Sequence, residues 1–206
     1  MTANKKWKVL RSQVAFNHRW YKVRQDIVEL PNGEVIDDYF VSVRPDIALV
    51  LPITQNHEIV FVRQYRHGVG EVLIELPAGT FDPEQEDAAT AARREFEEET
   101  GYTAERLLAL ATLYDNPVKE TNKIHLFLAQ DAHPVGKQML DITEDIDVLL
   151  IPISAVAGKI RQGELQVAGS VAALFLGLNH LGLLNLIGQK CRSQESAVSH
   201  SLDSRF

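Results

Sequence analysis

Six short apolar runs, separated by turns and helical stretches, constrain the fold of this chain more than any other feature. They are rich in β-branched residues and too short for core helices, so each predicts a strand. The runs span residues 47–52, 59–64, 72–76, 107–113, 124–129 and 148–152. Helical patterns cover about 86–100, 154–162 and 168–187. Helices that alternate with strands cover both faces of a sheet, so we predict an α/β fold around a mixed sheet.

A β-hairpin is predicted ahead of these runs. Residues 20–29 and 34–43 show a mostly alternating pattern of apolar and polar side chains. Between them, Pro31-Asn32-Gly33-Glu34 contains the Asn-Gly pair that tight hairpin turns favour. Arg44-Pro45 follows and interrupts strand pairing, which marks a boundary.

Composition divides the chain into three expected parts. After Gln189 the sequence is rich in serine and has no apolar period, which favours disorder. We therefore expect an N-terminal β element over residues 1–45, a main domain over 46–189 and a disordered tail over 190–206.

Charge and cysteine content narrow the classes of function. The chain has 28 acidic and 21 basic side chains, a formal charge of −7, which argues against binding to a nucleic-acid backbone. The single cysteine, Cys191, excludes an internal disulfide and fits a reducing compartment. Residues 170–188 carry no charge, but Asn179, His180 and Asn185 interrupt them, which favours a packed helix over a membrane span. We expect a cytoplasmic protein that binds neither nucleic acid nor membrane.

Three carboxylates gather on one face of the helix predicted at 86–100. Glu95, Glu98 and Glu99 are spaced i, i+3 and i+4. They repel one another, and near the helix C-terminus they also oppose the macrodipole. Mg²⁺ or Mn²⁺, which prefer oxygen ligands, would neutralise them. A solvated acidic face is the alternative, because Arg94 can pair with Glu98 at i+4. The spacing alone leaves both interpretations open.

The same helix has a stripe of small residues. Ala88, Ala89 and Ala92 share this stripe with Phe96, so we predict that the helix packs closely on the sheet through them. Gly101 follows as the expected C-cap.

Residues 94–102, Arg-Glu-Phe-Glu-Glu-Glu-Thr-Gly-Tyr, resemble the second half of the Nudix box, R-E-U-x-E-E-x-G-U, where U is bulky and apolar or aromatic. Glu86 lies eight residues before Arg94, as the box requires. The box pattern requires its opening glycine at position 80, where this chain has Thr80. The glycine is instead Gly79, so the loop from it to Glu86 is one residue longer than the pattern. The resemblance implies an α/β/α sandwich around a mixed sheet.

The resemblance also implies a metal site for Mg²⁺, with Mn²⁺ as a possible substitute. Its ligands would be Glu95, Glu98 and Glu99, together with the backbone carbonyl of Ala78 in Leu76-Pro77-Ala78-Gly79. Glu98 and Glu99 would be catalytic. Arg94 and Glu86 would then stabilise the box rather than bind the metal.

Three features resemble the ADP-ribose pyrophosphatase branch of the Nudix hydrolase superfamily. These are Val62-Arg63-Gln64-Tyr65-Arg66, the N-terminal hairpin, and Pro117, sixteen residues after Gly101. The branch implies hydrolysis of ADP-ribose or a related nucleoside diphosphate sugar to a nucleoside monophosphate and a sugar phosphate. It also implies a homodimer built through the N-terminal β element, which contributes to the substrate site.

Arginines are the expected diphosphate ligands, because guanidinium groups bind phosphate oxygens well. By resemblance Arg66 is the first choice and Arg44 the second. Arg63 and Arg66 lie three residues apart on a strand and point to opposite faces, so one of them is expected to be structural. Trp20, or Tyr21 beside it, is a candidate for stacking on adenine, with burial in a core as the alternative.

The general base is expected on the acidic loop 141–147, because in this branch it often lies after the box. Glu144 is the first candidate, with Asp141 and Asp145 as alternatives; a solvated acidic loop is the other interpretation. Lys119-Glu-Thr-Asn122 departs from the commoner glycine-containing loop of the branch, which leaves the sugar open.

Two rival functions remain on the sequence. One is the same chemistry on another nucleotide, such as a nucleoside triphosphate or a dinucleoside polyphosphate; capped RNA is disfavoured by the acidic charge. The other is a non-catalytic module that senses nucleotides. Such modules usually lose box glutamates, whereas Glu95, Glu98 and Glu99 are all present, which favours an enzyme.

Overall fold

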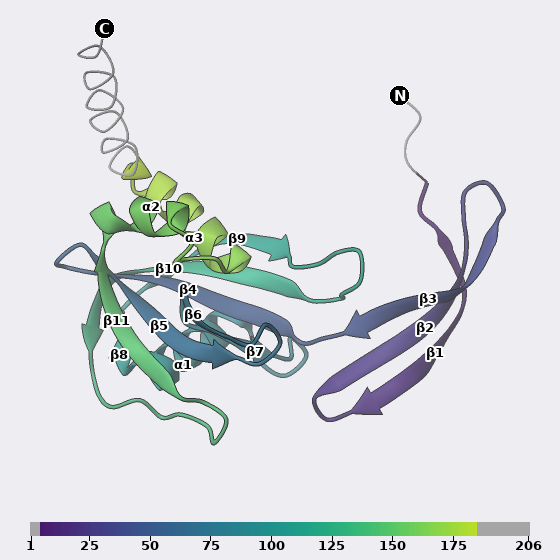
Figure 1. Ribbon diagram of the computed structural model, residues 1–206, viewed down its shortest axis with the longest axis horizontal. Coiled ribbons are helices and arrows are strands. Elements are labelled where there is room, and N and C mark those ends of the chain that lie inside the picture. The colour runs from purple at the N-terminus through teal and green to yellow at the C-terminus, as the bar shows by residue number, and fades with distance from the viewer. Residues whose placement is uncertain (1–4, 185–206) are drawn as a thin grey trace, which may run out of the picture.

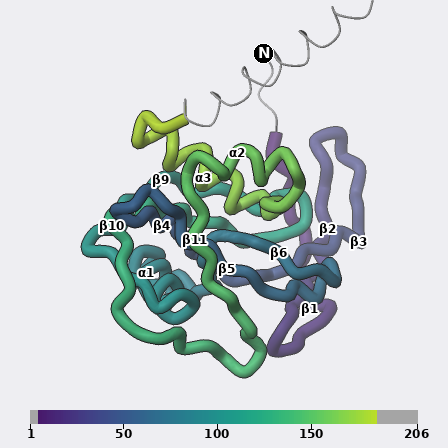
Figure 2. The backbone as a smooth tube through the Cα atoms, turned by 60° about the vertical axis from the view of Figure 1, so that its left-hand side comes forward, coloured from purple at the N-terminus to yellow at the C-terminus, as the bar shows by residue number. Residues whose placement is uncertain are grey.

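A computed structural model describes residues 5–184 and shows an α/β/α sandwich with a separate N-terminal sheet (Figure 1). The three helices of the described part are α1 (Ala88–Thr100), α2 (Ile153–Arg161) and α3 (Ala168–His180). Helix α1 covers one face of the main sheet, and α2 and α3 cover the other, as Figure 2 shows from a second direction. The predicted α/β/α sandwich is therefore confirmed.

The main sheet has eight strands of mixed direction. Its path runs β11-β5-β4-β10-β8, with β6 paired to β5, β7 to β4 and β9 to β10. The pair β4–β10 is parallel and the other pairs are antiparallel, so the sheet is mixed as expected. The strands are β4 (Asp46–Thr54), β5 (Glu58–Arg66), β6 (Glu71–Glu75), β7 (Ala78–Phe81), β8 (Tyr102–Thr103), β9 (Leu107–Tyr114), β10 (Lys123–Pro134) and β11 (Ile146–Pro152).

Strand β4 shows why its sequence forms a central strand. Leu49 and Leu51 pack into the core under α2 and α3, whereas Ala48 and Val50 pack into the core under α1. Both faces are covered, so nearly every residue is apolar and β-branched or aliphatic residues predominate. Gly177 of α3 lies directly against Leu51, where a Cβ would overlap the leucine side chain.

The N-terminal sheet is antiparallel and consists of β1 (Lys8–His18), β2 (Tyr21–Glu29) and β3 (Val35–Val43). It stands to the right of the main body in Figure 1. Strands β2 and β3 are the predicted hairpin, but β1 was not predicted. All residues of β1 are exposed, so it has no buried face to produce an apolar alternation. Backbone contacts tie β3 to the loop before β10: Ser42 N–H donates to the Lys119 carbonyl at 2.7 Å.

The predicted small-residue stripe on α1 is partly wrong. Ala92 and Phe96 are buried and Ala88 is partly buried, but Ala89 is exposed and Ala91 is buried instead. The buried face of α1 is wider than the predicted stripe and includes Ala91, whereas Ala89 lies in the first turn and is exposed.

Helix α3 is shorter than predicted. It ends at His180, and Gly182 follows with a φ of 69°, a left-handed conformation that stops the helix. Within residues 5–184 no helix is long and apolar enough to cross a membrane. The predicted disordered tail over 190–206, Cys191 and the predicted helical residues 185–187 lie outside the described residues.

Candidate active-site cleft

A cleft of about 620 Å³ lies between the end of β5, the start of β7, helix α1 and the loop before β11. Its wall is formed by Gln64, Tyr65, Arg66, Ala78, Gly79, Thr80, Arg94, Glu95, Glu98, Glu99, Met139, Asp141, Thr143 and Glu144. Seven of the residues predicted as metal ligands, diphosphate ligand or general base therefore meet in one place: Arg66, Ala78, Glu95, Glu98, Glu99, Asp141 and Glu144.

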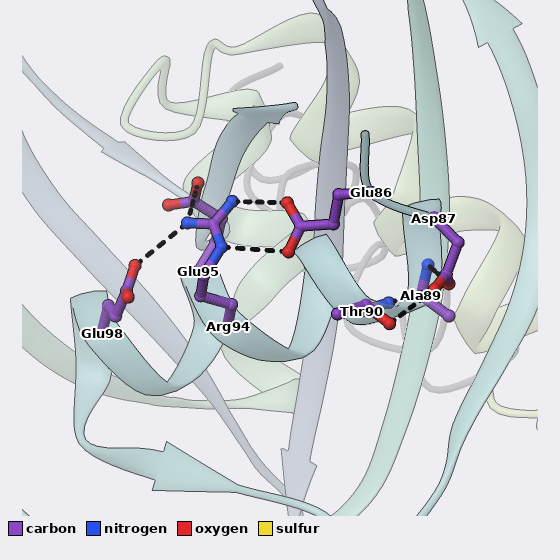
Figure 3. Close-up of polar contacts among 7 residues, drawn as sticks. All are labelled: Glu86, Asp87, Ala89, Thr90, Arg94, Glu95 and Glu98. Carbon is purple, nitrogen blue, oxygen red and sulfur yellow. Dashed lines mark hydrogen bonds and ion pairs between the residues drawn. The ribbon is translucent and has the colours of Figure 1, made fainter. Parts of the chain in front are cut away.

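Both ends of α1 are fixed by caps, which holds the glutamates in place. At the N-terminus, Asp87 Oδ1 accepts from the N–H groups of Ala89 and Thr90 at 3.0 and 3.1 Å, contacts that Figure 3 draws. The hydrogen bonds from Thr90 lower the pKa of Asp87. At the C-terminus, Gly101 has a φ of 69° and its N–H donates to the Glu97 carbonyl at 2.9 Å. The predicted C-cap at Gly101 is confirmed, whereas the N-cap at Asp87 was not predicted.

Arg94 joins three glutamates (Figure 3). It contacts both carboxylate oxygens of Glu86, from Nε at 3.2 Å and from Nη2 at 3.0 Å. Its Nη1 donates to Glu95 at 2.7 Å and to Glu98 at 3.1 Å. These hydrogen bonds, first of all those with Glu86, raise the pKa of Arg94. Arg94 and Glu86 thus form an ion pair behind two of the predicted metal ligands, with the fork geometry that only arginine provides.

Glu99 is the most buried of the three box carboxylates, with 4% of the residue exposed. Its Oε2 accepts from the backbone N–H of Ala78 at 2.9 Å. Burial raises the pKa of Glu99 to about 8; the charges of Glu95 and Glu144 act in the same direction, whereas the Ala78 N–H and Arg66 oppose it. A carboxyl group with this pKa is largely protonated at neutral pH unless a cation stabilises its charge.

Glu95 is held in a similar environment. Burial is the main cause that raises the pKa of Glu95, and the charges of Glu98 and Glu144 add to it against the contacts from Arg94. A buried and a half-buried carboxyl group, both with raised pKa values, therefore face one cleft, which indicates a functional site rather than the solvated acidic face.

Gly79 explains the displaced glycine of the box. A Cβ at position 79 would overlap the carboxylate of Glu95, so only glycine leaves this carboxylate its place. Thr80 is exposed on the next position of β7. The glycine is therefore required by contact with Glu95, and the longer loop towards Glu86 follows from that requirement.

The donor set fits a divalent cation. Glu95, Glu98 and Glu99 supply oxygen atoms, which hard cations such as Mg²⁺ prefer. Within residues 5–184 no three acidic, histidine or cysteine side chains converge as closely as ligands of a bound metal. Arg94 accounts for this spacing, since it holds one oxygen each of Glu95 and Glu98.

Other predicted residues do not line the cleft. Trp20 lies in the turn between β1 and β2, is 69% exposed and has Arg19 stacked 4.8 Å from its ring centre. Arg44 pairs with Glu120 at 3.3 Å at the junction of the two sheets. Asp145 is exposed on the loop but does not form part of the cleft wall.

The two arginines of β5 are separated as their spacing predicted. Arg66 forms part of the cleft wall, whereas Arg63 pairs with Asp147 of β11 at 2.7 Å. Arg63 is therefore the structural member of the pair.

Sequence reasoning missed two buried polar residues beside Arg66. Gln64 lies two positions before it on β5 and forms part of the cleft wall; its Nε2 has no hydrogen-bond partner among residues 5–184. Glu75, at the end of β6, accepts from Arg66 Nε at 2.6 Å. The alternation of β5 was the available signal for Gln64, because residues two apart share a face.

Comparisons with known proteins agree with this site. Residues 7–42 match the nucleoside diphosphate sugar hydrolase N-terminal domain, and residues 43–167 match the NUDIX domain. An ADP-ribose pyrophosphatase of Bacillus subtilis (strain 168) is 29% identical over 168 residues, covering 81% of this chain and 90% of that protein. A GDP-mannose pyrophosphatase of Cronobacter sakazakii (strain ATCC BAA-894) is 32% identical over 148 residues, covering 68% of this chain and 74% of that protein.

A solved structure extends the similarity to three dimensions. The crystal structure of an ADP compounds hydrolase matches with a TM-score of 0.76 at 25% identity, covering 89% of this chain and 100% of that chain. The NUDIX match spans more than half of the sequence and contains every residue of the cleft wall. The chain therefore belongs to the NUDIX domain family and is a Nudix hydrolase.

Proposed function

We propose that this enzyme hydrolyses the diphosphate bond of ADP-ribose or a related nucleoside diphosphate sugar, giving a nucleoside monophosphate and a sugar phosphate. The observation that carries the proposal is the meeting of three box glutamates with Arg66 and Glu144 in one cleft. The names of the similar proteins, an ADP-ribose pyrophosphatase and a GDP-mannose pyrophosphatase, support this substrate class. A cytoplasmic location is part of the proposal and is supported by the single cysteine.

The proposed cofactor is Mg²⁺, with Mn²⁺ as a substitute, held by Glu95, Glu98, Glu99 and the backbone carbonyl of Ala78. When bound, the cation withdraws charge from phosphate oxygens and lowers the pKa of water. Burial disfavours the charged form of Glu99 unless a cation is bound beside it, and its hydrogen bond from the Ala78 N–H fixes its orientation. Arg66 binds the diphosphate through its outer nitrogens.

Glu144 is the proposed general base. Its carboxylate removes a proton from water as the water oxygen bonds to phosphorus, and the bond from that phosphorus to the bridging oxygen breaks. Glu144 lies near enough to raise the pKa values of Glu95 and Glu99. Its Oε2 accepts from the Asp141 N–H at 2.9 Å, which orders the loop. Asp141 also belongs to the cleft wall and is the alternative base.

The proposed homodimer brings a second N-terminal sheet to the cleft. Trp20 and Arg44 lie outside the cleft of their own protomer, so roles in adenine stacking and diphosphate binding require a partner copy. Apolar side chains that a partner would cover are exposed along β1, β2 and the turn between them. They include Val9, Leu10, Val14, Phe16, Trp20 and Tyr21. Patches of this kind mark interaction surfaces.

Chromatographic detection of the cleaved monophosphate products, over a panel of nucleoside diphosphate sugars, dinucleoside polyphosphates and nucleoside triphosphates, tests the function. Wild type with Mg²⁺ or Mn²⁺ is compared with Glu99→Gln, for which we expect a loss of activity of about 100-fold. Glu97→Gln is the matched control, because Glu97 lies on the same helix but contacts Thr103 outside the cleft. Absence of turnover on every compound by folded wild type would support the nucleotide-sensing alternative. Equal turnover by wild type and Glu99→Gln would contradict the assignment of Glu99 to the metal site.

Light scattering tests the dimer. Wild type should have twice the mass of the chain, and Phe16→Asp should lower it, because an ionised side chain cannot be buried in an apolar interface without large cost. Asn17→Asp places the same charge on the neighbouring position of β1 and should leave the mass unchanged. A monomeric wild type would contradict the role given to the N-terminal sheet.

A further inference from the structure

We propose that Glu75 is a positioning residue: its buried carboxylate grips Arg66 from inside the protein and aims the outer guanidinium nitrogens into the cleft. The inference rests on the proposed function, because it assigns Arg66 to the diphosphate. Glu75 itself does not belong to the cleft wall and touches no reacting atom.

The two side chains differ sharply in exposure. The Glu75 side chain is 8% exposed and that of Arg66 is 43% exposed, and Arg66 Nε lies 2.6 Å from Glu75 Oε1. Strands β5 and β6 pair antiparallel with Val62 opposite Glu75 and Arg66 opposite Glu71, so the bond joins side chains that lie four positions apart in the register. Arg66 is thus anchored on its buried side and open on the side of the cleft.

The point of contact on the guanidinium matters. Arginine has five N–H donors, and the bond to Glu75 uses the one on Nε. Among residues 5–184 no group accepts a hydrogen bond from either Nη atom of Arg66. The four outer N–H groups therefore remain available for the oxygens of a diphosphate, in a plane that Glu75 fixes.

Glu75 also keeps Arg66 from the metal-binding carboxylates. Arg66 lies close enough to Glu99 for its charge to act on that carboxyl group. Without Glu75, Arg66 gains the freedom to pair with Glu99, and the cation and the diphosphate would both lose a ligand. Glu75 thus keeps the Arg66 guanidinium, which binds the substrate, apart from the Glu99 carboxylate, which binds the cation.

A purely structural role explains Glu75 less well. Burying a carboxylate costs solvation, and a buried ion pair gives little net stability compared with apolar residues of the same size. The preceding residues of β6, Val72, Leu73 and Ile74, show that an apolar side chain would suit this strand. A charged residue at position 75 is explained by what it does to Arg66.

Binding of inorganic pyrophosphate, measured by calorimetry in excess chelator, tests the inference without turnover. We expect Glu75→Ala and Arg66→Ala each to weaken binding about tenfold. In the Arg66→Ala background, Glu75→Ala should have no further effect, because Glu75 acts through Arg66. Arg63→Ala, on the opposite face of the same strand, is the control and should bind like wild type.

Glu75→Gln retains an acceptor oxygen and should keep most of the affinity, which also covers the case in which Glu75→Ala fails to fold. Additive losses in the double variant would overturn the inference, as would wild-type affinity in Glu75→Ala. Tighter binding by both Glu75 variants would overturn it too, by showing that Glu75 only opposes the charge of Arg66. If wild type binds pyrophosphate with this pattern but cleaves no nucleoside diphosphate sugar, the proposed function fails and the inference on Arg66 stands.

Discussion

Replacing Gly79 with alanine should weaken metal binding but leave the free energy of unfolding almost unchanged. The new Cβ would overlap the carboxylate of Glu95, so one of the two must move. Helix α1 is fixed by its two caps and by buried Phe96, whereas the end of the Glu95 side chain is held mainly by one contact from Arg94 and is the easier part to move. We therefore expect the Glu95 carboxylate to swing out and the backbone to stay.

The magnitudes follow from the contacts that change. Swinging Glu95 out breaks its 2.7 Å contact with Arg94; the two side chains are 14% and 37% exposed, and the Glu95 carboxylate regains solvation outside, so the net loss is on the order of 1 kcal/mol. Alanine in place of glycine at a compatible strand position stabilises by about 0.4–1 kcal/mol through the unfolded state. The free energy of unfolding should therefore change by less than about 1 kcal/mol. Disturbing a metal ligand, by contrast, costs on the order of 10–100-fold in metal affinity.

Two measurements on the same protein test this. Urea unfolding in chelator reports the free energy of unfolding, and activity against Mg²⁺ concentration reports half-saturation, which should rise about 10–100-fold. Gly158→Ala in α2 is the matched control, since a Cβ there meets nothing within 4 Å. An unchanged Mg²⁺ requirement would refute the placement of the cation at Glu95. A loss of stability above about 3 kcal/mol, as expected for an overpacked core, would refute the idea that only the side chain moves.

Two further predictions concern pH and the end of α1. In metal-free protein the raised pKa of Glu99, about 8, means that the native state keeps a proton that the unfolded state releases above about pH 4.5. The free energy of unfolding should therefore fall as pH rises from about 4.5 to about 8, and Glu99→Gln should flatten this fall in urea titrations; parallel pH profiles would contradict the assignment. Gly101→Ala should cost more than the roughly 1–2 kcal/mol of a left-handed residue, because its Cβ would lie 2.7 Å from a backbone oxygen. Gly33→Ala, at a φ of 88° with open space around it, should show only the backbone part, and equal losses in the two variants would exclude the clash.

Burial on both faces made the central strands the easiest elements to predict. Strands β4, β5 and β10 pass through the core, so each contains an apolar run. Strand β1 is exposed throughout, so its sequence has no apolar run. Strands β7 and β8 have only four and two residues, too few to show a pattern. The spacing of Glu95, Glu98 and Glu99 is also local, since one helix turn brings them together.

Contacts between segments far apart in the chain could not be predicted from the sequence. The bond from Arg66 to Glu75 depends on the register of β5 against β6, which the length of the intervening turn decides. Gly79 appeared misplaced because the pattern counts residues in a loop, whereas the structure requires room for Glu95. Whether Trp20 and Arg44 reach a cleft depends on an assembly of two chains, which spacing along one chain does not determine.

The single parallel pair of the sheet has a consequence for the synthesis of this enzyme. At its start, Lys123 N–H donates to an oxygen of Asp46 across 77 residues of chain. Such long-range pairing forms late, because the loop must close before its contacts stabilise it. Every box glutamate leaves the ribosome before β10 does, and β10 must insert beside β4 before the main sheet is continuous. The growing chain therefore carries all of its proposed cation ligands for some time before it has the sheet that gives them their geometry.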